Sequence, residues 1–161
     1  MPIRLATTLD HAAIAALVIA FRNHLQRTAP SDQALSRSVE RLLASGDAEF
    51  CLFEADVEGA ADGARRVLGY VLLRFRESMW ASGTEATLED LFVDPAARQG
   101  GVGRQLVQFA VQRARDRTCT TLCLDTNENN IASQRIYQAI GFSAFSPRWQ
   151  GQQIFYRLGL G

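Results

Sequence analysis

The spacing of apolar residues along the chain changes several times between a helical period and strand alternation. Helical spacing predicts two N-terminal helices, one ending at about Arg27 and one running from about Ser31 to Ala44. The sequence Thr7-Thr8-Leu9-Asp10 has capping-box spacing and is placed to open the first helix. Runs rich in β-branched and aromatic residues predict strands over Ile3–Ala6, Glu49–Glu54, Val67–Phe75, Thr84–Val93, Thr120–Thr126, Phe142–Phe145 and Gln153–Leu158.

The second half of the chain alternates strands with helices. A helix is expected after the glycine-rich turn that ends at Gly103, and a short one over Ile131–Ala139, ended by Gly141. The Gly/Ala-rich stretch Gly59–Arg66 predicts the turn of a β-hairpin. This alternation favours an α/β fold with a mixed sheet, and 161 residues fit a single domain.

The charge composition excludes several classes of protein. Seventeen basic and seventeen acidic residues cancel, so the chain lacks the basic excess of a nucleic-acid binder. Every basic residue is Arg, which removes Schiff-base enzymes and Walker-type nucleotide sites because both need a lysine amine. The only histidines, His11 and His24, lie about 220° apart around one predicted helix. A histidine-based metal centre or hydrolase triad is therefore not expected.

The cysteines and the longest apolar run indicate a cytoplasmic protein without a membrane segment. Cys51, Cys119 and Cys123 are odd in number and scattered, and we interpret them as reduced, packed thiols. No further Cys or His lies near Cys119 and Cys123, so no metal site is predicted. The apolar run Ala12–Phe21 is too short to cross a bilayer and has no basic leader before it.

A glycine-rich turn stands where a predicted strand hands over to a helix. Gly100, Gly101 and Gly103 leave the backbone open to a ligand, and the first helical amides then point at it. These features are typical of a phosphate or pyrophosphate site, although a tight turn without a ligand has the same sequence. A dinucleotide fold needs a further glycine near Leu106, which the chain lacks.

Three motifs in order resemble the GNAT superfamily of N-acetyltransferases. Arg98-Gln99-Gly100-Gly101-Val102-Gly103 resembles its R/Q-x-x-G-x-G/A acetyl-CoA signature. Upstream, Leu88–Pro95 is similar to the family's fourth strand, and downstream Asn130-x-x-Ser133-x-x-x-Tyr137-x-x-x-Gly141-Phe142 is similar to its second conserved block. The resemblance implies one GNAT domain over residues 1–161. Its central sheet is mixed, mainly antiparallel, of about seven strands and flanked by helices, and it splays apart between two parallel strands.

The resemblance also implies acetyl-CoA as cosubstrate and a set of residues that hold it. Backbone amides of the glycine turn bind the pyrophosphate, the fourth strand pairs with the pantetheine arm, and Asn130 bonds the same arm unless it only caps its helix. The implied cofactor-binding residues are Leu91, Phe92, Val93, Arg98, Gln99, Gly100, Gly101, Val102, Gly103, Arg104, Asn130 and Ser133.

The catalytic residues implied are Tyr137, Glu89 and Asp90. Tyr137 stays protonated at neutral pH and protonates the departing thiolate, unless it is only a buried aromatic. Strand alternation puts Glu89 and Asp90 on opposite faces, with Leu88, Asp90 and Phe92 together, although the family often has a bulge here. We favour Glu89 as the base and Asp90 as a substrate ligand or structural partner. Either carboxylate can also serve only to keep the strand face solvated.

The acceptor is expected to be a small cationic primary amine. Trp80-x-x-Gly83 with the following carboxylates resembles a polyamine-type branch, and Arg22, Arg27 and Asp32 are candidates to border the acceptor. A peptide N-acetyltransferase, a non-catalytic acyl-CoA-binding module and a nucleotide binder remain alternatives. Neither nucleic acid nor membrane is expected as a partner, whereas exposed C-terminal strands such as Gln153–Leu158 are available to pair across a homodimer.

Overall fold

The computed structural model describes residues 2–56, 64–98 and 100–160. They pack into two compact units, Met1–Leu124 and Asp125–Gly161, and each unit is described by itself. Most of the expected hairpin turn Gly59–Arg66 and the candidate residue Gln99 lie outside the described residues.

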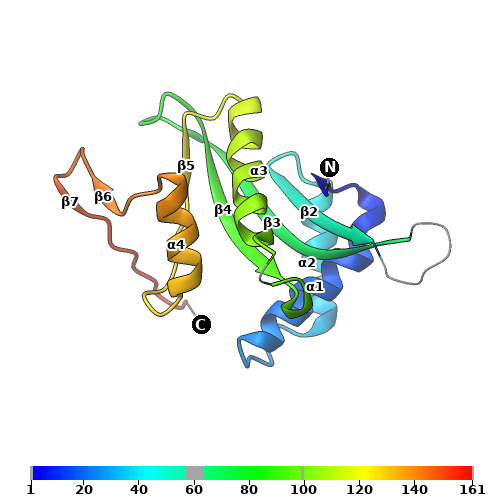
Figure 1. Cartoon of the computed structure of the whole chain (residues 1–161). Coiled ribbons are helices and arrows are strands. Elements are labelled where there is room, and N and C mark those ends of the chain that lie inside the picture. Colours follow the sequence, from blue (N-terminus) through cyan, green and yellow to red (C-terminus); the bar gives the residue numbers. More distant parts are fainter. Residues whose placement is uncertain (1, 57–63, 99, 161) are drawn as a thin grey trace. The chain divides into compact units, whose positions relative to one another are not determined.

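The first unit is built on a five-stranded sheet in the order β1-β2-β3-β4-β5 (Figure 1). Neighbouring strands are antiparallel except β4 and β5, which are parallel, so the expected mixed, mainly antiparallel sheet is confirmed. The strands are β1 Ile3–Leu5, β2 Ala48–Asp56, β3 Arg65–Ser78, β4 Gly83–Val93 and β5 Thr121–Cys123. The strand expected over Thr120–Thr126 is therefore shorter than its sequence pattern indicated.

Helices α1 and α2 cover one face of this sheet, and α3 covers the other (Figure 1). Their bounds are α1 His11–His24, α2 Asp32–Ala44 and α3 Val102–Asp116. The expected capping box is present at Thr7 and Asp10, and in it the Asp10 carboxylate accepts a hydrogen bond from the Thr7 amide at 2.7 Å. The first helix ends at His24, before the expected Arg27, and the left-handed φ of 55° at Gln26 does not continue a helix.

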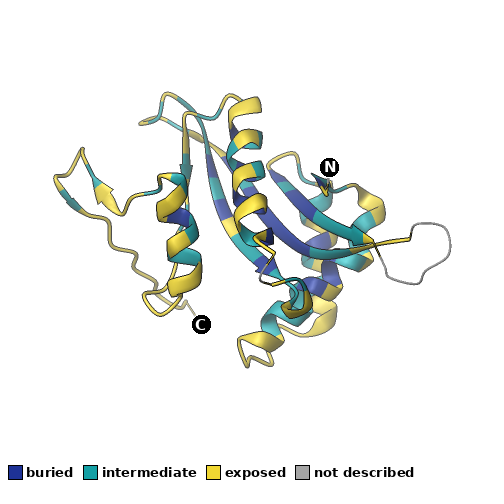
Figure 2. Cartoon of the chain, in the orientation of Figure 1, coloured by how far each residue is buried: buried dark blue, intermediate teal, exposed yellow. Residues whose placement is uncertain are grey.

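The two faces of strand β3 pack against different layers of helices. Tyr70 and Leu72 join the core cluster that α1 and α2 build with β2 and with Phe92. Gly69 faces α3, since a Cβ there would approach the Leu106 Cδ1 atom to 3.2 Å. Alternation then places Leu73 on the α3 face as well. Figure 2 shows the resulting belt of buried residues along the middle of the sheet.

The second unit contains α4 Ile131–Ile140 and a two-stranded sheet of β6 Phe145–Ser146 and β7 Gly151–Gln152. Helix α4 ends at Gly141, as expected, where φ is 109°. The strand expected over Phe142–Phe145 is displaced to Phe145–Ser146. The strand expected over Gln153–Leu158 does not form, because this segment has no ladder partner among the described residues. In the described residues the central sheet therefore has five strands and not the expected seven or so, because β6 and β7 form a separate sheet.

The three cysteines are all free thiols. Burial raises the pKa of Cys51 to about 12, and burial also raises the pKa of Cys119 and of Cys123. Cys51 is packed as expected, whereas Cys123 is exposed. Within residues 2–56, 64–98 and 100–160 no three Cys, His, Asp or Glu side chains gather as metal ligands. Over the same ranges, none of the helices has the length and apolar character needed to span a bilayer.

Candidate functional site

Strands β4 and β5 are paired over only three residues of each. The ladder joins Glu85–Thr87 to Thr121–Cys123 and stops there. Over the rest of β4, Leu88–Val93, the edge away from β3 has no strand partner among the described residues. An unpaired edge offers backbone N–H and C=O groups to an extended ligand. The sheet therefore opens on the segment that carries the candidate residues Leu91, Phe92 and Val93.

The glycine turn joins this open segment to helix α3. Asp94 ends the strand, and its side chain accepts a hydrogen bond from the Ala96 amide at 2.9 Å. Gly101 precedes the first residue of α3, with a φ of 70° that favours glycine. The first amides of an α-helix have no intrahelical acceptor, and they carry the positive end of the helix dipole. Those of α3 belong to Val102, Gly103 and Arg104, so the turn presents donors for an anion as the sequence predicted.

Arg98 ties the turn back to β4. Its Nε donates to the Val93 carbonyl at 3.1 Å, and its guanidinium carbon lies 5.8 Å from the centre of the Phe92 ring. These contacts hold Arg98 against the end of β4. They also occupy one lone pair of the Val93 carbonyl, so Arg98 limits which backbone groups of β4 a ligand can reach.

A β-bulge sits in β4 at the predicted catalytic carboxylates. Leu72 pairs with Asp90 and Leu73 pairs with Leu88, which leaves Glu89 as the additional residue. Directly paired residues lie on the same face, so Leu88 faces α3, whereas Asp90 faces α1 and α2. The regular alternation that grouped Leu88 with Asp90 and Phe92 is therefore wrong, because the bulge reverses it.

The two carboxylates contact neighbours on the same side of the sheet. Glu89 is half exposed and accepts a long hydrogen bond of 3.4 Å from Arg74, a β3 residue beside α2. Asp90 lies beside the buried phenol of Tyr70, and burial together with the Asp90 charge raises the pKa of Tyr70. The bulge thus brings both carboxylates to the face of α1 and α2, where alternation had separated them.

Helix α4 carries the remaining candidates, in the second unit. The Asn130 side chain accepts a hydrogen bond from the Ser133 amide at 3.4 Å and so caps the helix. Helix capping is the structural alternative to its expected role in binding the pantetheine arm. Tyr137 is 7% exposed and packs edge to face against Phe142. Burial raises the pKa of Tyr137, and a hydrogen bond with Ser133 opposes part of this. The phenol therefore keeps its proton at neutral pH and is able to donate it.

Other residues proposed for the acceptor side have different surroundings. Arg22 and Asp32 form an ion pair at 2.7 Å, and Arg22 also donates to the Pro30 carbonyl, so they brace the α1–α2 connection. These contacts lie within that connection and give no support to a role at the bulge. Trp80 lies in the turn between β3 and β4 and is 77% exposed.

Sequence reasoning missed two residues that contact the carboxylates. Arg74 bridges Glu89 and Asp47, and Tyr70 lies against Asp90. Arg74 could have been found from the sequence, because it is the one charged residue in an otherwise apolar run, Val71–Phe75. Tyr70 gave no such signal, because an aromatic residue in a strand is ordinary core material.

The glycine turn and the open β4 edge both lie within a part of the chain that matches a known protein family. The model of the acetyltransferase (GNAT) family matches residues 18–142, which is more than half of the chain. The aminoglycoside N(6')-acetyltransferase type 1 of Salmonella typhimurium is 36% identical over 70 residues, 44% of this chain and 45% of that enzyme. The ribosomal protein bS18 alanine N-acetyltransferase of Haemophilus ducreyi is 33% identical over 64 residues, 40% of this chain and 44% of that enzyme. The matched part thus spans less than half the length of these curated relatives.

Solved structures match over nearly the whole chain. A protein of Arthrobacter sp. FB24 named as an acetyltransferase has a TM-score of 0.81 at 25% identity, covering 98% of this chain and 95% of that one. An aminoglycoside N-acetyltransferase in complex with CoA has a TM-score of 0.71 at 25% identity, covering 97% and 93%. With the family model spanning most of the sequence, these findings show that the chain belongs to the GNAT family of acetyltransferases.

Proposed function

We propose that this protein is an acetyl-CoA-dependent N-acetyltransferase that moves an acetyl group to a primary amine. One feature carries the proposal: the unpaired half of β4 runs into a glycine-capped helix whose free amides suit a pyrophosphate. The match to the family model supports it and crosses the boundary between the two units. We propose accordingly that residues 1–161 act as one domain.

Two groups of residues are proposed for acetyl-CoA binding. The turn amides from Gln99 to Arg104 hold the pyrophosphate, and the backbone of Leu91–Val93 pairs with the pantetheine arm. Arg98 keeps the turn against β4 through its bond to the Val93 carbonyl. Asn130 and Ser133 contribute from the start of α4, where Asn130 also caps the helix.

The reaction is a direct attack within a ternary complex. The amine nitrogen forms a bond to the thioester carbonyl carbon, and the carbon–sulfur bond breaks. Glu89 takes the proton that the amine must lose, directly or through water. Tyr137 gives its phenolic proton to the thiolate, and a backbone amide of the Leu91 segment stabilises the oxyanion. No covalent enzyme intermediate is involved, because the motifs contain no cysteine.

Glu89 is the better candidate for the base, and Asp90 for a supporting residue. Glu89 is the bulged residue and has about half of its side chain exposed, so solvent and substrate can reach it. Asp90 lies against the buried Tyr70 phenol. Glu89→Gln is therefore expected to lower kcat more than Asp90→Asn does.

The acceptor in this proposal is a small cationic amine. Two carboxylates on one face of the bulge attract a positive group. Relatives are named for aminoglycosides, for the alanine of a ribosomal protein and for thialysine, all of which offer amines. A peptide acceptor is the second candidate, favoured by the ribosomal-protein relatives. A non-catalytic acyl-CoA-binding module is the third.

A homodimer is proposed on separate grounds. The segment after β7 has no regular secondary structure and carries apolar side chains that are 63–93% exposed, namely Ile154, Phe155, Tyr156, Leu158 and Leu160. Pairing with a second copy would bury these apolar side chains and complete backbone hydrogen bonds. Light scattering is expected to give twice the chain mass, and removal of residues 153–161 is expected to give a monomer.

The function is tested by release of CoA thiol from acetyl-CoA with polyamines, amino acids, aminoglycosides and short peptides. We expect turnover with one acceptor class, and a loss of about 10²-fold or more in kcat for Tyr137→Phe. The matched control is Tyr156→Phe, since Tyr156 is 85% exposed. Acetyl-CoA binding without turnover supports the non-catalytic module. Absence of acetyl-CoA binding contradicts the proposal.

A further inference from the structure

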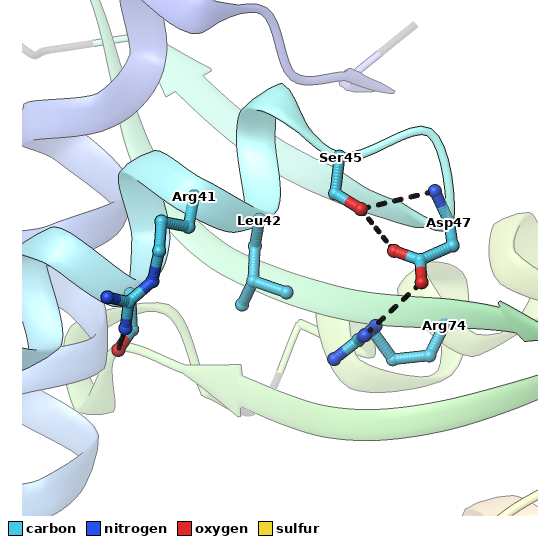
Figure 3. Close-up of a pocket in the computed structure, with 6 residues that line it drawn as sticks. Arg41, Leu42, Ser45, Asp47 and Arg74 are labelled. Carbon is cyan, nitrogen blue, oxygen red and sulfur yellow. Dashed lines mark hydrogen bonds and ion pairs between the residues drawn. The ribbon is translucent and has the colours of Figure 1, made fainter.

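A polar pocket of about 390 Å³ lies between the C-terminal half of α2, the turn that follows it and strand β3 (Figure 3). It is on the face of the sheet to which the bulge directs Glu89 and Asp90. In Figure 3 Leu42 points into it from α2, flanked by the side chains of Arg41 and Arg74. Its lining residues are Ser38, Arg41, Leu42, Ser45, Asp47 and Arg74.

The pocket has more hydrogen-bond donors than acceptors. The Arg41 guanidinium donates to the Ser38 hydroxyl at 3.2 Å and has no carboxylate within ion-pair distance in the described part of the chain. The Nε atom of Arg74 is buried and has no hydrogen-bond partner there. A guanidinium offers five N–H donors and no acceptor, so most of these donors have no partner among the described residues.

The existing partners of Arg74 are held loosely. Its nitrogens lie 3.6 Å from the Asp47 carboxylate and 3.4 Å from that of Glu89. Charge-assisted hydrogen bonds of this kind are usually about 2.7–2.9 Å long. Arg74 is thus close to two anions without a tight bond to either, and a further anionic oxygen is able to compete for it.

The charges of the lining favour an anion. The lining contains two guanidinium groups and one carboxylate, and the hydroxyls of Ser38 and Ser45 add donors without adding charge. Leu42 provides an apolar wall that suits a short hydrocarbon segment. Arg74 belongs both to this lining and to the contact with Glu89, so a ligand in the pocket lies next to the proposed base.

We propose that this pocket binds a carboxylate group of the acceptor, so that the acceptor is an amino acid or a similar molecule with an amine and a carboxylate. The inference rests on the proposed function, because the amine end is the one presented to Glu89. Arg41 binds the carboxylate at the α2 side of the pocket, Leu42 packs on the carbons between the two ends, and the amine lies at the bulge beside Glu89 and Arg74. An amine without an anionic group makes the contacts at the bulge but not those with the Arg41 side chain.

The test is a binding measurement that does not need turnover. Isothermal titration of the full-length protein, with and without CoA, compares lysine with cadaverine and ornithine with putrescine. The members of each pair differ by one carboxylate. We expect each amino acid to bind at least about tenfold more tightly than its matched diamine, the size of one charge-assisted hydrogen bond. Arg41→Gln is expected to bring this ratio close to one.

Arg37→Gln is the matched control, because Arg37 is an arginine of the same helix that does not line the pocket. It is expected to keep the wild-type ratio. The proposal is overturned if neither amino acid binds more tightly than its diamine, whether both bind equally or neither binds. It is also overturned if Arg41→Gln keeps the preference. Failure of acetyl-CoA binding or turnover contradicts the proposed function instead, so the two failures are distinguishable.

Discussion

The two units of this protein are held in shape by different interactions. Met1–Leu124 contains all but one of the buried apolar residues of the described chain, on both faces of its sheet. In Asp125–Gly161 only Tyr137 is buried among the described residues, and large apolar side chains such as Trp149 and Tyr156 are exposed. The first unit is therefore stabilised by packing, and the second by local signals: the Asn130 cap, the Gly141 stop and one hairpin.

This difference bears on how each unit positions its candidate residues. In the first unit the bulge at Glu89 is fixed by strand pairing on both sides of it, Arg98 is bonded to the Val93 carbonyl, and helix α3 is packed through its buried residues. In the second, Tyr137 depends on a ten-residue helix, a length that is marginal alone. Ligand binding is expected to stabilise the second unit more than the first.

The largest expected contrast is between core positions of the first unit and apolar positions of the second. Leu52→Ala, at a fully buried site of β2, is expected to lower the free energy of unfolding by about 2–5 kcal/mol. Leu158→Ala, at a site 82% exposed, is expected to change it by less than about 0.5 kcal/mol. Urea denaturation at low protein concentration measures both. Equal losses would mean that the C-terminal segment is packed as tightly as the sheet.

A second prediction concerns an ion pair of the first unit. Hydrogen bonds from Arg4 and from Thr7 lower the pKa of Asp10 from 3.8 to about 2. Because the folded pKa lies below the unfolded one, the stabilisation is complete above about pH 4 and is lost as the pH falls towards 2. Asp10→Asn is expected to lose about 1–3 kcal/mol at pH 7.

The urea midpoints of wild type and Asp10→Asn are expected to converge between pH 4 and pH 2. Asp116→Asn is the control, since Asp116 accepts its hydrogen bond from a neutral glutamine of its own helix, Gln112. A difference that stays constant down to pH 2 would exclude the ion pair as the cause.

Two glycines allow the same change to be made once in each unit. Gly101 and Gly141 both have left-handed φ values, and no atom lies within 4 Å of the position that a Cβ would take, so strain and not a clash opposes a side chain. Each alanine variant is expected to lose about 1–2 kcal/mol. For Gly101→Ala the loss of stability is expected to appear in global urea unfolding, and acetyl-CoA binding is expected to weaken as well. The loss at Gly141 is expected as faster amide exchange in α4 alone.

Gly46→Ala is the control for both variants, because Gly46 has open space around it and no left-handed φ. If Gly141→Ala lowers global stability as much as Gly101→Ala does, the two units unfold together, and the contrast between them is wrong.

The smallest effect is on the titration of Tyr137. Burial raises its pKa, and the hydrogen bond from Ser133 counteracts part of that rise. Ser133→Ala is therefore expected to raise the pKa of Tyr137 further, with little change in stability. The difference in ultraviolet absorbance between each protein and its Tyr137→Phe partner isolates this phenol from Tyr70 and Tyr156. A lowered pKa in Ser133→Ala would contradict the assignment.

Much of the first unit was predictable from the sequence. The capping box at Thr7, the helix expected from about Ser31 and the run Thr84–Val93 are local signals, and each formed nearly as expected. The second unit was predicted less well, since the apolar run Gln153–Leu158 has no partner strand among the described residues. Strand propensity favours an extended chain, but only a paired neighbour completes its hydrogen bonds.

The sequence by itself determined the chemistry of the candidate site: a glycine turn before a helix, adjacent carboxylates in a strand and a tyrosine behind an asparagine cap. Only the tertiary structure decided which neighbours the carboxylates contact. The register shift against β3 makes Glu89 a bulge and directs Asp90 to Tyr70, and the fold brings Arg74 beside Glu89. Such pairings join residues far apart in the chain, and their register depends on the packing of both sheet faces, which a local pattern does not contain.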